Sequence, residues 1–300
     1  MLWNEFPRIL SSGRQGRIMP LKLTRRGFLF GGVALGAGSR ALALAPALAG
    51  VEFAFIQVTD THVSKRRLFD ARRGYDVPAD ESIRRCRAVV RDINKCSLPY
   101  EIVVHTGDVA HTRDTMEDYD LARELLQFDR PAYYVPGNHD VGYSETGAYR
   151  PEFEKRFGKC NQAIEPVKGL RIAMIDSQPL DPRADGEDYE QAFAHLDRVL
   201  TPAMPTILCC HVMGLASFHV NRLWDAWPES TMLRWTERMK QGGVVAVLGG
   251  HFHRDEYQVV NGVPFHLCGP VINMWGRQTC YRHWEVTDGC LTYRTVYLEI

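Results

Sequence analysis

The chain has 300 residues, of which 45% are hydrophobic and 24% charged, so it is long enough to bury a large core in one or two domains. Its 36 basic residues balance its 36 acidic residues, and the sequence pI is about 7.2. A broad polyanion-binding surface is therefore not expected, and neither is a nucleic-acid partner.

The first 49 residues have the composition of an export signal. In "LTRRGFLFGGVALGAGSRALALAPALAG" a basic stretch precedes an apolar one from Phe28 to Gly38, and Ala47-Leu48-Ala49 fits an A-x-A cleavage site before Gly50. The apolar stretch is too short to cross about 30 Å of hydrocarbon, so we expect no stable membrane span. We predict a signal-bearing region over residues 1–49 and a mature domain over residues 50–300, with a membrane-anchored protein as the alternative if the signal stays uncleaved.

The adjacent Arg25 and Arg26, with Thr24 before them and Phe28-Leu29 after them, resemble the twin-arginine signals of bacteria. Phe30 stands where that pattern often has a lysine. The resemblance implies that the twin-arginine translocase carries the protein, already folded and commonly loaded with its metal, to the periplasm. A chance arginine pair in an ordinary basic signal is the alternative.

After Gly50, short apolar runs alternate with longer helical patterns, which predicts one layered α/β domain. Strands are expected at residues 53–58, 101–106, 132–135, 170–175, 205–210, 244–248 and 263–267. Helices are expected at residues 79–94, 116–126, 189–200 and 230–241, where apolar residues recur at helical spacing. The last stretch, residues 281–299, is expected to form a β-hairpin that turns at Asp288-Gly289.

The eight cysteines do not form an evident disulfide framework. In the predicted C-terminal hairpin, Cys280 faces Tyr297 and Cys290 faces Thr287, so neither meets another cysteine. We therefore expect mostly reduced and buried cysteines, even in an exported protein.

Five predicted strands are followed by side chains that bind metal ions well. Asp60 and His62 follow the apolar part of FIQVTDTHV, and Asp108 follows that of VVHTGDVAH. Asn138, His139 and Asp140 follow in YYVPGNHDV, His211 follows in ILCCHVM, and His251 and His253 follow in VAVLGGHFH. Ligands of open α/β sheets bind beyond the carboxyl ends of the strands. His251 and His253 are also two residues apart, so in an extended segment they point the same way. The sequence therefore predicts one shared site.

In this order the segments resemble the signature of the calcineurin-like metallophosphoesterases, D-x-H, G-D, G-N-H-[D/E], H and G-H-x-H. The signature is complete here as Asp60-Thr61-His62, Gly107-Asp108, Gly137-Asn138-His139-Asp140, His211 and Gly250-His251-Phe252-His253. The resemblance covers nearly all of the mature chain. Within the family, the chain is similar to the cyclic-nucleotide phosphodiesterase-like branch. It implies an α/β/β/α sandwich of mixed sheets flanked by helices. Purple acid phosphatases place a tyrosine where this chain has His111, which counts against that branch.

The family pattern implies two metal ions with Asp108 as the bridging ligand. One ion would lie on Asp60, His62, Asp108 and His253, and the other on Asp108, Asn138, His211 and His251. These oxygen and nitrogen ligands without a thiolate suit two divalent or mixed-valence ions such as Mn, Fe or Zn. Such a pair stays cationic beside two aspartates, attracts a phosphate ester and turns a bridging water into the attacking hydroxide.

His139 is the motif histidine left off the metals, and the resemblance implies a catalytic role in which it protonates the departing alkoxide. A histidine that only supports its loop is the alternative, and Asp140 is expected to orient His139 or a metal ligand. His111 is a candidate for substrate contact, as are Arg113 and the basic loop SKRRLFDARRGYD, although a solvated loop remains an alternative for them.

The sequence thus predicts a periplasmic dinuclear metallophosphoesterase that hydrolyses phosphodiesters of small molecules. A phosphomonoesterase is one alternative, because the same centre serves both reactions. A non-catalytic module that binds metal or a partner on this scaffold is another. Nuclease activity is disfavoured by the neutral net charge and by the absence of a visible aromatic and basic groove in the sequence.

Overall fold

The computed structural model describes residues 47–112, 116–142, 149–181, 186–215 and 226–300. Residues 1–46 of the predicted signal region, with Arg25 and Arg26, and the candidate Arg113 lie outside these residues. Among the helices that are described, none has the length and hydropathy needed to cross a membrane.

The first large sheet carries the N-terminal part of the candidate site. Its strands run in the order β13-β12-β1-β4-β5. Their bounds are β1 Phe53–Val58, β4 Ile102–His105, β5 Ala132–Tyr134, β12 Cys280–Thr287 and β13 Cys290–Tyr297. Strands β1, β4 and β5 are parallel, so their carboxyl ends lie at the same edge of the sheet. Strands β12 and β13 form the predicted C-terminal hairpin, which pairs antiparallel with β1.

The second large sheet carries the C-terminal part of the candidate site, and its strands run in the order β10-β11-β9-β8-β7-β6. Their bounds are β6 Gln162–Val167, β7 Leu170–Met174, β8 Thr206–Cys209, β9 Val244–Gly249, β10 Glu256–Val260 and β11 Val263–Leu267. The four central strands are parallel and the two edge strands are antiparallel to their neighbours. All six residues of β9 are buried, as in a parallel strand covered on both faces.

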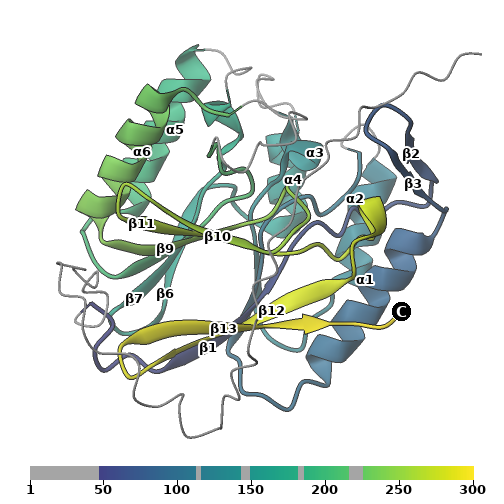
Figure 1. Cartoon of the computed structure of the whole chain (residues 1–300), viewed down its shortest axis with the longest axis horizontal. Helices are drawn as coiled ribbons and strands as arrows, with labels where there is room; N and C mark the ends of the chain where they lie inside the picture. Colours follow the sequence, from purple (N-terminus) through teal and green to yellow (C-terminus); the bar gives the residue numbers. More distant parts are fainter. Residues whose placement is uncertain (1–46, 113–115, 143–148, 182–185, 216–225) are drawn as a thin grey trace, which may run out of the picture. The chain divides into compact units, whose positions relative to one another are not determined.

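The two sheets pack face to face and helices cover their outer faces (Figure 1). The bounds are α1 Glu81–Asn94, α2 Met116–Leu125, α3 Asn138–Val141, α4 Arg150–Phe157, α5 Gly186–Val199 and α6 Glu229–Gly242. Side chains such as Phe55, Ile172 and Leu248 fill the layer between the sheets. Helices α1, α2 and α4 pack on the first sheet, and α5 and α6 on the second. The predicted α/β/β/α sandwich is therefore confirmed.

Every predicted strand and helix is present, with ends within three residues of the expected ones. The hairpin register is also as predicted, with Cys280 opposite Tyr297 and Thr287 opposite Cys290. All eight cysteines are unpaired, and six of them are buried.

The elements that the sequence did not predict are short or lie at an edge. They are β6, β10, α3, α4, a small hairpin of β2 (Leu68–Asp70) with β3 (Tyr75–Val77), and the 3-10 turns η1 (Gln178–Leu180) and η3 (Met274–Gly276). Strands β6 and β10 are edge strands whose side chains alternate between half-buried and exposed along most of their length. They therefore lack the apolar run that marks a buried strand.

The predicted cleavage site lies in a turn at the start of the described chain. Leu48 is only 1% exposed and packs in the layer between the two sheets, and its carbonyl accepts a hydrogen bond of 3.1 Å from the amide of Val51. A cut after Ala49 would therefore remove a leucine from the core.

We expect Leu48→Ala to lower the free energy of unfolding by about 2–5 kcal/mol, the usual cost of deleting a buried leucine side chain. Leu233→Ala on α6 is the matched control, because Leu233 is 43% exposed and should change stability little. Urea unfolding of both variants, made from Ala47 onward, measures the difference. Equal stability of the two variants would show that Leu48 adds nothing to the core.

Candidate metal centre

The loops that follow the strands of both sheets meet in one cleft. The loops after β1, β4 and β5 come from the first sheet, and those after β8 and β9 from the second. They bring together the predicted site residues Asp60, His62, Asp108, Asn138, His139, His211, His251 and His253. All of these residues are buried except His139, which is half-buried.

Asp60, His62 and His253 form the first group of potential ligands, with one ligand atom from each lying within 4.8 Å of the others. His253 Nε2 lies 3.1 Å from Asp60 Oδ1 and 3.3 Å from His62 Nε2. His62 Nε2 lies 3.4 Å from Asp108 Oδ2. Two imidazole nitrogens and two carboxylate oxygens therefore converge, which is a donor set that suits a divalent cation.

Asp108, His211 and His251 form the second group, so Asp108 adjoins both. The Nδ1 atom of His211 donates a hydrogen bond of 2.8 Å to the carbonyl of Thr106, which leaves the lone pair of the neutral ring on Nε2. In the neutral ring this buried Nε2 has no proton to donate, although Asp108 Oδ2 lies only 3.1 Å away. Two lone pairs that face each other repel unless a cation lies between them, so the arrangement fits a metal ion.

The pKa values of the site residues lead to the same conclusion. Burial alone would lower the pKa of His211, but the charge of Asp108 outweighs it and raises that pKa to about 9. Burial would raise the pKa of Asp60 and Asp108, but the surrounding imidazoles outweigh it and hold both pKa values below the ordinary range. The site thus buries two carboxylates, and without a metal it takes up a proton instead.

Five candidate ligands have a backbone conformation that residues other than glycine rarely adopt. Their φ angles lie between 42° and 71°, and they are Asp60, His62, Asp108, His251 and His253. Each such residue costs on the order of 1–3 kcal/mol, and backbone strain of this kind gathers at functional sites. The surrounding structure therefore holds the ligand loops in shapes that the chain would not adopt for folding alone.

Two motif glycines allow the ligand loops to approach one another. A Cβ atom on Gly137 would overlap the carboxylate and the amide of Asp108, and one on Gly250 would overlap Thr59 and Asp60. Thr59 Oγ1 and the amide of His251 both donate to the Asp60 carboxylate across this contact. Neither glycine has a positive φ, so it is the missing side chain that matters at both positions.

We expect Gly137→Ala to weaken metal binding about 10–100-fold, the range found when the support of a metal ligand is disturbed. Gly186→Ala is the matched control, because a Cβ atom there meets nothing within 4 Å. Elemental analysis after dialysis against a graded chelator measures the retained metal. Equal retention by the two variants would contradict the close approach of Gly137 and Asp108.

The Asp140 carboxylate ties two ligand loops together. It accepts hydrogen bonds from the amides of Val109, Ala110 and Gly137, at 3.1, 3.1 and 2.8 Å. These bonds join the loop after β4, which carries Asp108, to the loop after β5. Asp140 therefore supports the loops that carry the metal ligands, which is one of the two roles that the sequence predicted for it. Its carboxylate bonds backbone amides, and these bonds do not orient the His139 ring.

His111 lies behind two other site histidines. Its Nδ1 is 3.2 Å from His62 Nδ1, and its carbonyl accepts a bond of 2.6 Å from His139 Nδ1. Burial, with the neighbouring imidazoles, lowers the pKa of His111 to about 2, so the ring is neutral and can accept the Nδ1 proton of His62. This contact would direct Nε2 of His62 toward the candidate metal. Contact between His111 and the substrate stays a prediction.

His105 is a supporting residue that the sequence did not single out. Its Nδ1 accepts the amide of Gly107 at 3.3 Å, so its Nε2 donates to Thr61 Oγ1 at 3.0 Å. Burial lowers the pKa of His105 to about 3, which keeps the ring neutral. The ring therefore links the loop after β1 to the loop after β4. The only sequence signal is that it ends the apolar run of β4.

Four further residues line the cleft and come from elements that were not predicted. Arg73 and Tyr75 lie at the end of the small β2–β3 hairpin, and Met274 and Trp275 lie in η3. Arg73 and Tyr75 belong to the basic loop that was proposed to meet the substrate. Met274 and Trp275 carried no sequence signal.

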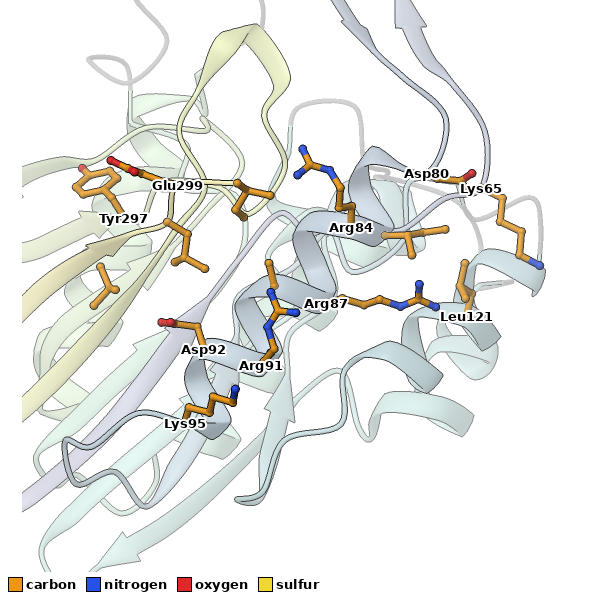
Figure 2. Close-up of a pocket in the computed structure, with 15 residues that line it drawn as sticks. Lys65, Asp80, Arg84, Arg87, Arg91, Asp92, Lys95, Leu121, Tyr297 and Glu299 are labelled. Carbon is orange, nitrogen blue, oxygen red and sulfur yellow. The ribbon is translucent and has the colours of Figure 1, made fainter.

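A larger hollow of about 1130 Å³ lies elsewhere, between α1 and the last residues of the chain. Figure 2 shows Arg84, Arg87, Arg91 and Lys95 along the helix on one side, with Tyr297 and Glu299 on the other. This hollow contains no histidine and none of the candidate ligands. The larger hollow therefore lacks the predicted metal ligands, and the smaller cleft is the candidate metal site.

Comparison with known proteins agrees with this geometry. A sequence profile described as calcineurin-like phosphoesterase matches residues 53–255, a range that contains every candidate ligand. The chain is 26% identical over 221 residues to a probable cyclic nucleotide phosphodiesterase of Rhodopseudomonas palustris, covering 71% of this chain and 76% of that protein. It is also 26% identical over 190 residues to a serine/threonine-protein phosphatase of Bos taurus, covering 59% of this chain and 60% of that protein.

The fold is similar to that of a dimetal phosphatase from Danio rerio, with a TM-score of 0.62. The superposition covers 81% of this chain and 95% of the fish protein, at 14% identity. At that identity the likeness describes the fold, and the chemistry must be argued from the cleft itself.

Proposed function

Because the chain belongs to the calcineurin-like phosphoesterase family, we propose that it is a dinuclear-metal-dependent hydrolase of phosphate esters that prefers phosphodiesters. The observation that carries this proposal is the pair of adjoining Asp and His groups that meet at Asp108 beyond the strand ends. In this proposal Asp60, His62, Asp108 and His253 hold one ion, and Asp108, Asn138, His211 and His251 hold the other.

When bound, the two ions would supply a nucleophile from water and stabilise the charge on the phosphate. The residues of the chain hold the site in shape. Thr59 and the amide of His251 fix the Asp60 carboxylate, and the amide of His139 donates to Asp108 Oδ1 at 2.9 Å. Burial of the ligands excludes water, which strengthens every charge interaction in the cleft.

His139 is the proposed proton donor to the leaving group. Its Nδ1 donates to the carbonyl of His111, which leaves Nε2 as the ring atom available to the substrate. Burial and the neighbouring imidazoles lower its pKa to about 4, against the opposing charge of Asp108, so the ring is neutral in the substrate-free protein. A bound anionic ester favours the protonated ring, which then carries its second proton on Nε2.

The preference for diesters is supported by the relative from Rhodopseudomonas palustris, whereas the relative from Bos taurus supports a phosphomonoesterase as the second candidate. The test is to purify the protein from Ala47 onward, measure its Mn, Fe and Zn, and assay bis-p-nitrophenyl phosphate against p-nitrophenyl phosphate before and after chelation. Close to two metals per chain, with diester hydrolysis lost on chelation and restored by Mn, is the expected result. Faster turnover of the monoester would favour the second candidate, and metal-replete protein without turnover would favour a binding module.

We further propose that the twin-arginine route exports the protein to the periplasm, on the evidence of Arg25 and Arg26. Replacing both arginines with lysine should then leave the protein in the cytoplasm. Unchanged export in fractionated cells would exclude this route.

A further inference from the structure

The small β2–β3 hairpin and η3 form one wall of the metal cleft. Arg73 and Tyr75 from the hairpin, and Met274 and Trp275 from η3, line the same cleft as His62, Asp108, Asn138, His139, His251 and His253. The two segments lie about 200 residues apart in the sequence. Any ester held between the candidate ligands would therefore lie beside these four side chains.

The wall is held together by direct contacts. Leu68, Tyr75 and Val77 pack against Ile272 and Met274 in a small buried cluster. The indole Nε1 of Trp275 donates a hydrogen bond of 2.6 Å to the carbonyl of Arg73, and the Trp275 ring meets the Tyr75 ring edge to face at 5.5 Å. The hairpin and η3 are thus fixed to each other, so Arg73 and Trp275 keep a defined place at the cleft.

Trp275 presents an aromatic surface beside a candidate ligand. Its ring centroid lies 5.0 Å from that of His253, with the two planes at 73°. Its φ of 55° is strained for a residue with a side chain, as are those of the candidate ligands. The residue is half-buried and lines the cleft. An aromatic side chain at the lining of a cleft suits stacking with a planar group of a bound ligand.

Arg73 presents a cation at the same wall. Among the described residues that line the cleft it is the only lysine or arginine. Its side chain is 44% exposed. Its Nε lies 3.8 Å from Asp70 Oδ2, which is a long distance for an ion pair. By contrast, Nε and Nη2 of Arg67, the residue before β2, both donate to the Asp76 carboxylate. The Arg73 guanidinium also interacts with the Tyr75 side chain, which lines the same cleft. Its exposed part can still bind an anion, and its planar fork matches phosphate oxygens.

We propose that Arg73 and Trp275 select the substrate, with Arg73 binding a phosphate oxygen and Trp275 stacking on a planar ring of the non-leaving alcohol. The substrate class is then phosphodiesters of nucleosides, in preference to diesters of small aliphatic alcohols. This inference rests on the proposed function, because it assumes that the ester is bound between the candidate ligands.

Two diesters with the same leaving group test the role of Trp275. Thymidine 5′-(p-nitrophenyl) phosphate carries a base, and methyl p-nitrophenyl phosphate does not. We expect kcat/KM of the metal-loaded protein to be about tenfold higher or more for the thymidine ester, within the range for stacking one base. Trp275→Leu should bring the ratio of the two values close to one, whereas Trp275→Phe should keep most of it. Thermal unfolding and metal content show whether each variant is folded and loaded.

The role of Arg73 is tested with its neighbour as the control. Arg73→Gln should raise KM for both esters, and the inhibition constant of inorganic phosphate, about tenfold, with a smaller change in kcat. Arg73→Lys should recover part of the loss. Arg72→Gln removes an adjacent exposed arginine that does not line the cleft, so it should change none of these values.

The outcomes separate the two proposals. Metal-loaded wild-type protein that hydrolyses neither ester overturns the proposed function, and this inference with it. Hydrolysis of both esters at equal kcat/KM, or a ratio that Trp275→Leu leaves unchanged, overturns the stacking role while the proposed function stands. Equal KM and phosphate inhibition for the Arg73→Gln and Arg72→Gln variants overturn the role of Arg73.

Discussion

Replacing Asp108 with asparagine should empty both halves of the candidate metal centre and lower kcat/KM for a phosphodiester by at least about 10³-fold. Asp108 Oδ2 lies 3.4 Å from His62 Nε2 and 3.1 Å from His211 Nε2, so a single carboxylate adjoins both groups of ligands. Two bound ions contribute several kcal/mol of charge stabilisation, and about 4 kcal/mol corresponds to a factor of about 10³ in rate.

The Asp108→Asn change is chosen because it removes the charge and keeps the shape. An asparagine oxygen can still accept the amide of His139, which donates to Asp108 Oδ1 at 2.9 Å. The metal-free fold should therefore survive, as thermal unfolding in chelator would show. Asp120→Asn is the matched control, because Asp120 is 65% exposed and pairs with Arg156 at the surface. A variant at position 108 that kept two ions and stayed within tenfold of wild-type activity would show that the carboxylate is not shared.

The sequence predicted the central strands well because their burial leaves a plain signal. A parallel strand covered on both faces must be apolar throughout, and VVAVLG in β9 is an example. The ligands were predictable for a related reason, since Asp or His directly after such a strand lies at the edge where the strands end. Edge strands such as β10 gave no comparable signal, because every second side chain along β10 is exposed and the others are only half-buried.

The wall of the cleft could not be predicted because it depends on contacts between distant segments. Nothing in the sequence around Trp275 shows that its indole donates to the carbonyl of Arg73. The place of His111 behind His62 is likewise a matter of packing, since the spacing of "GDVAH" allows the ring to face either the substrate or the protein. The strained φ angles of the ligands depend in the same way on the completed fold.

Replacing His139 with alanine should lower kcat about 10²- to 10⁴-fold while both metal ions stay bound, because His139 is proposed to act on the leaving group and not on the metals. The bond from His139 to Asp108 comes from the backbone amide, so the alanine variant keeps it. The side chain itself contributes the Nδ1 bond to His111 and an edge contact with the His62 ring at 4.7 Å. Metal analysis and kcat on the same preparation measure the two effects separately.

The dependence on the leaving group separates proton donation from mere support of the loop. Phenol is a poorer leaving group than p-nitrophenol, so methyl phenyl phosphate needs protonation more than methyl p-nitrophenyl phosphate does. We expect His139→Ala to slow the phenyl ester at least about tenfold more than the nitrophenyl ester. His195→Ala on α5 is the matched control, since His195 is also half-buried and does not line the cleft. Equal losses on the two esters, together with lost metal, would show that His139 only holds its loop in place, because a ring that donates no proton cannot distinguish one leaving group from another.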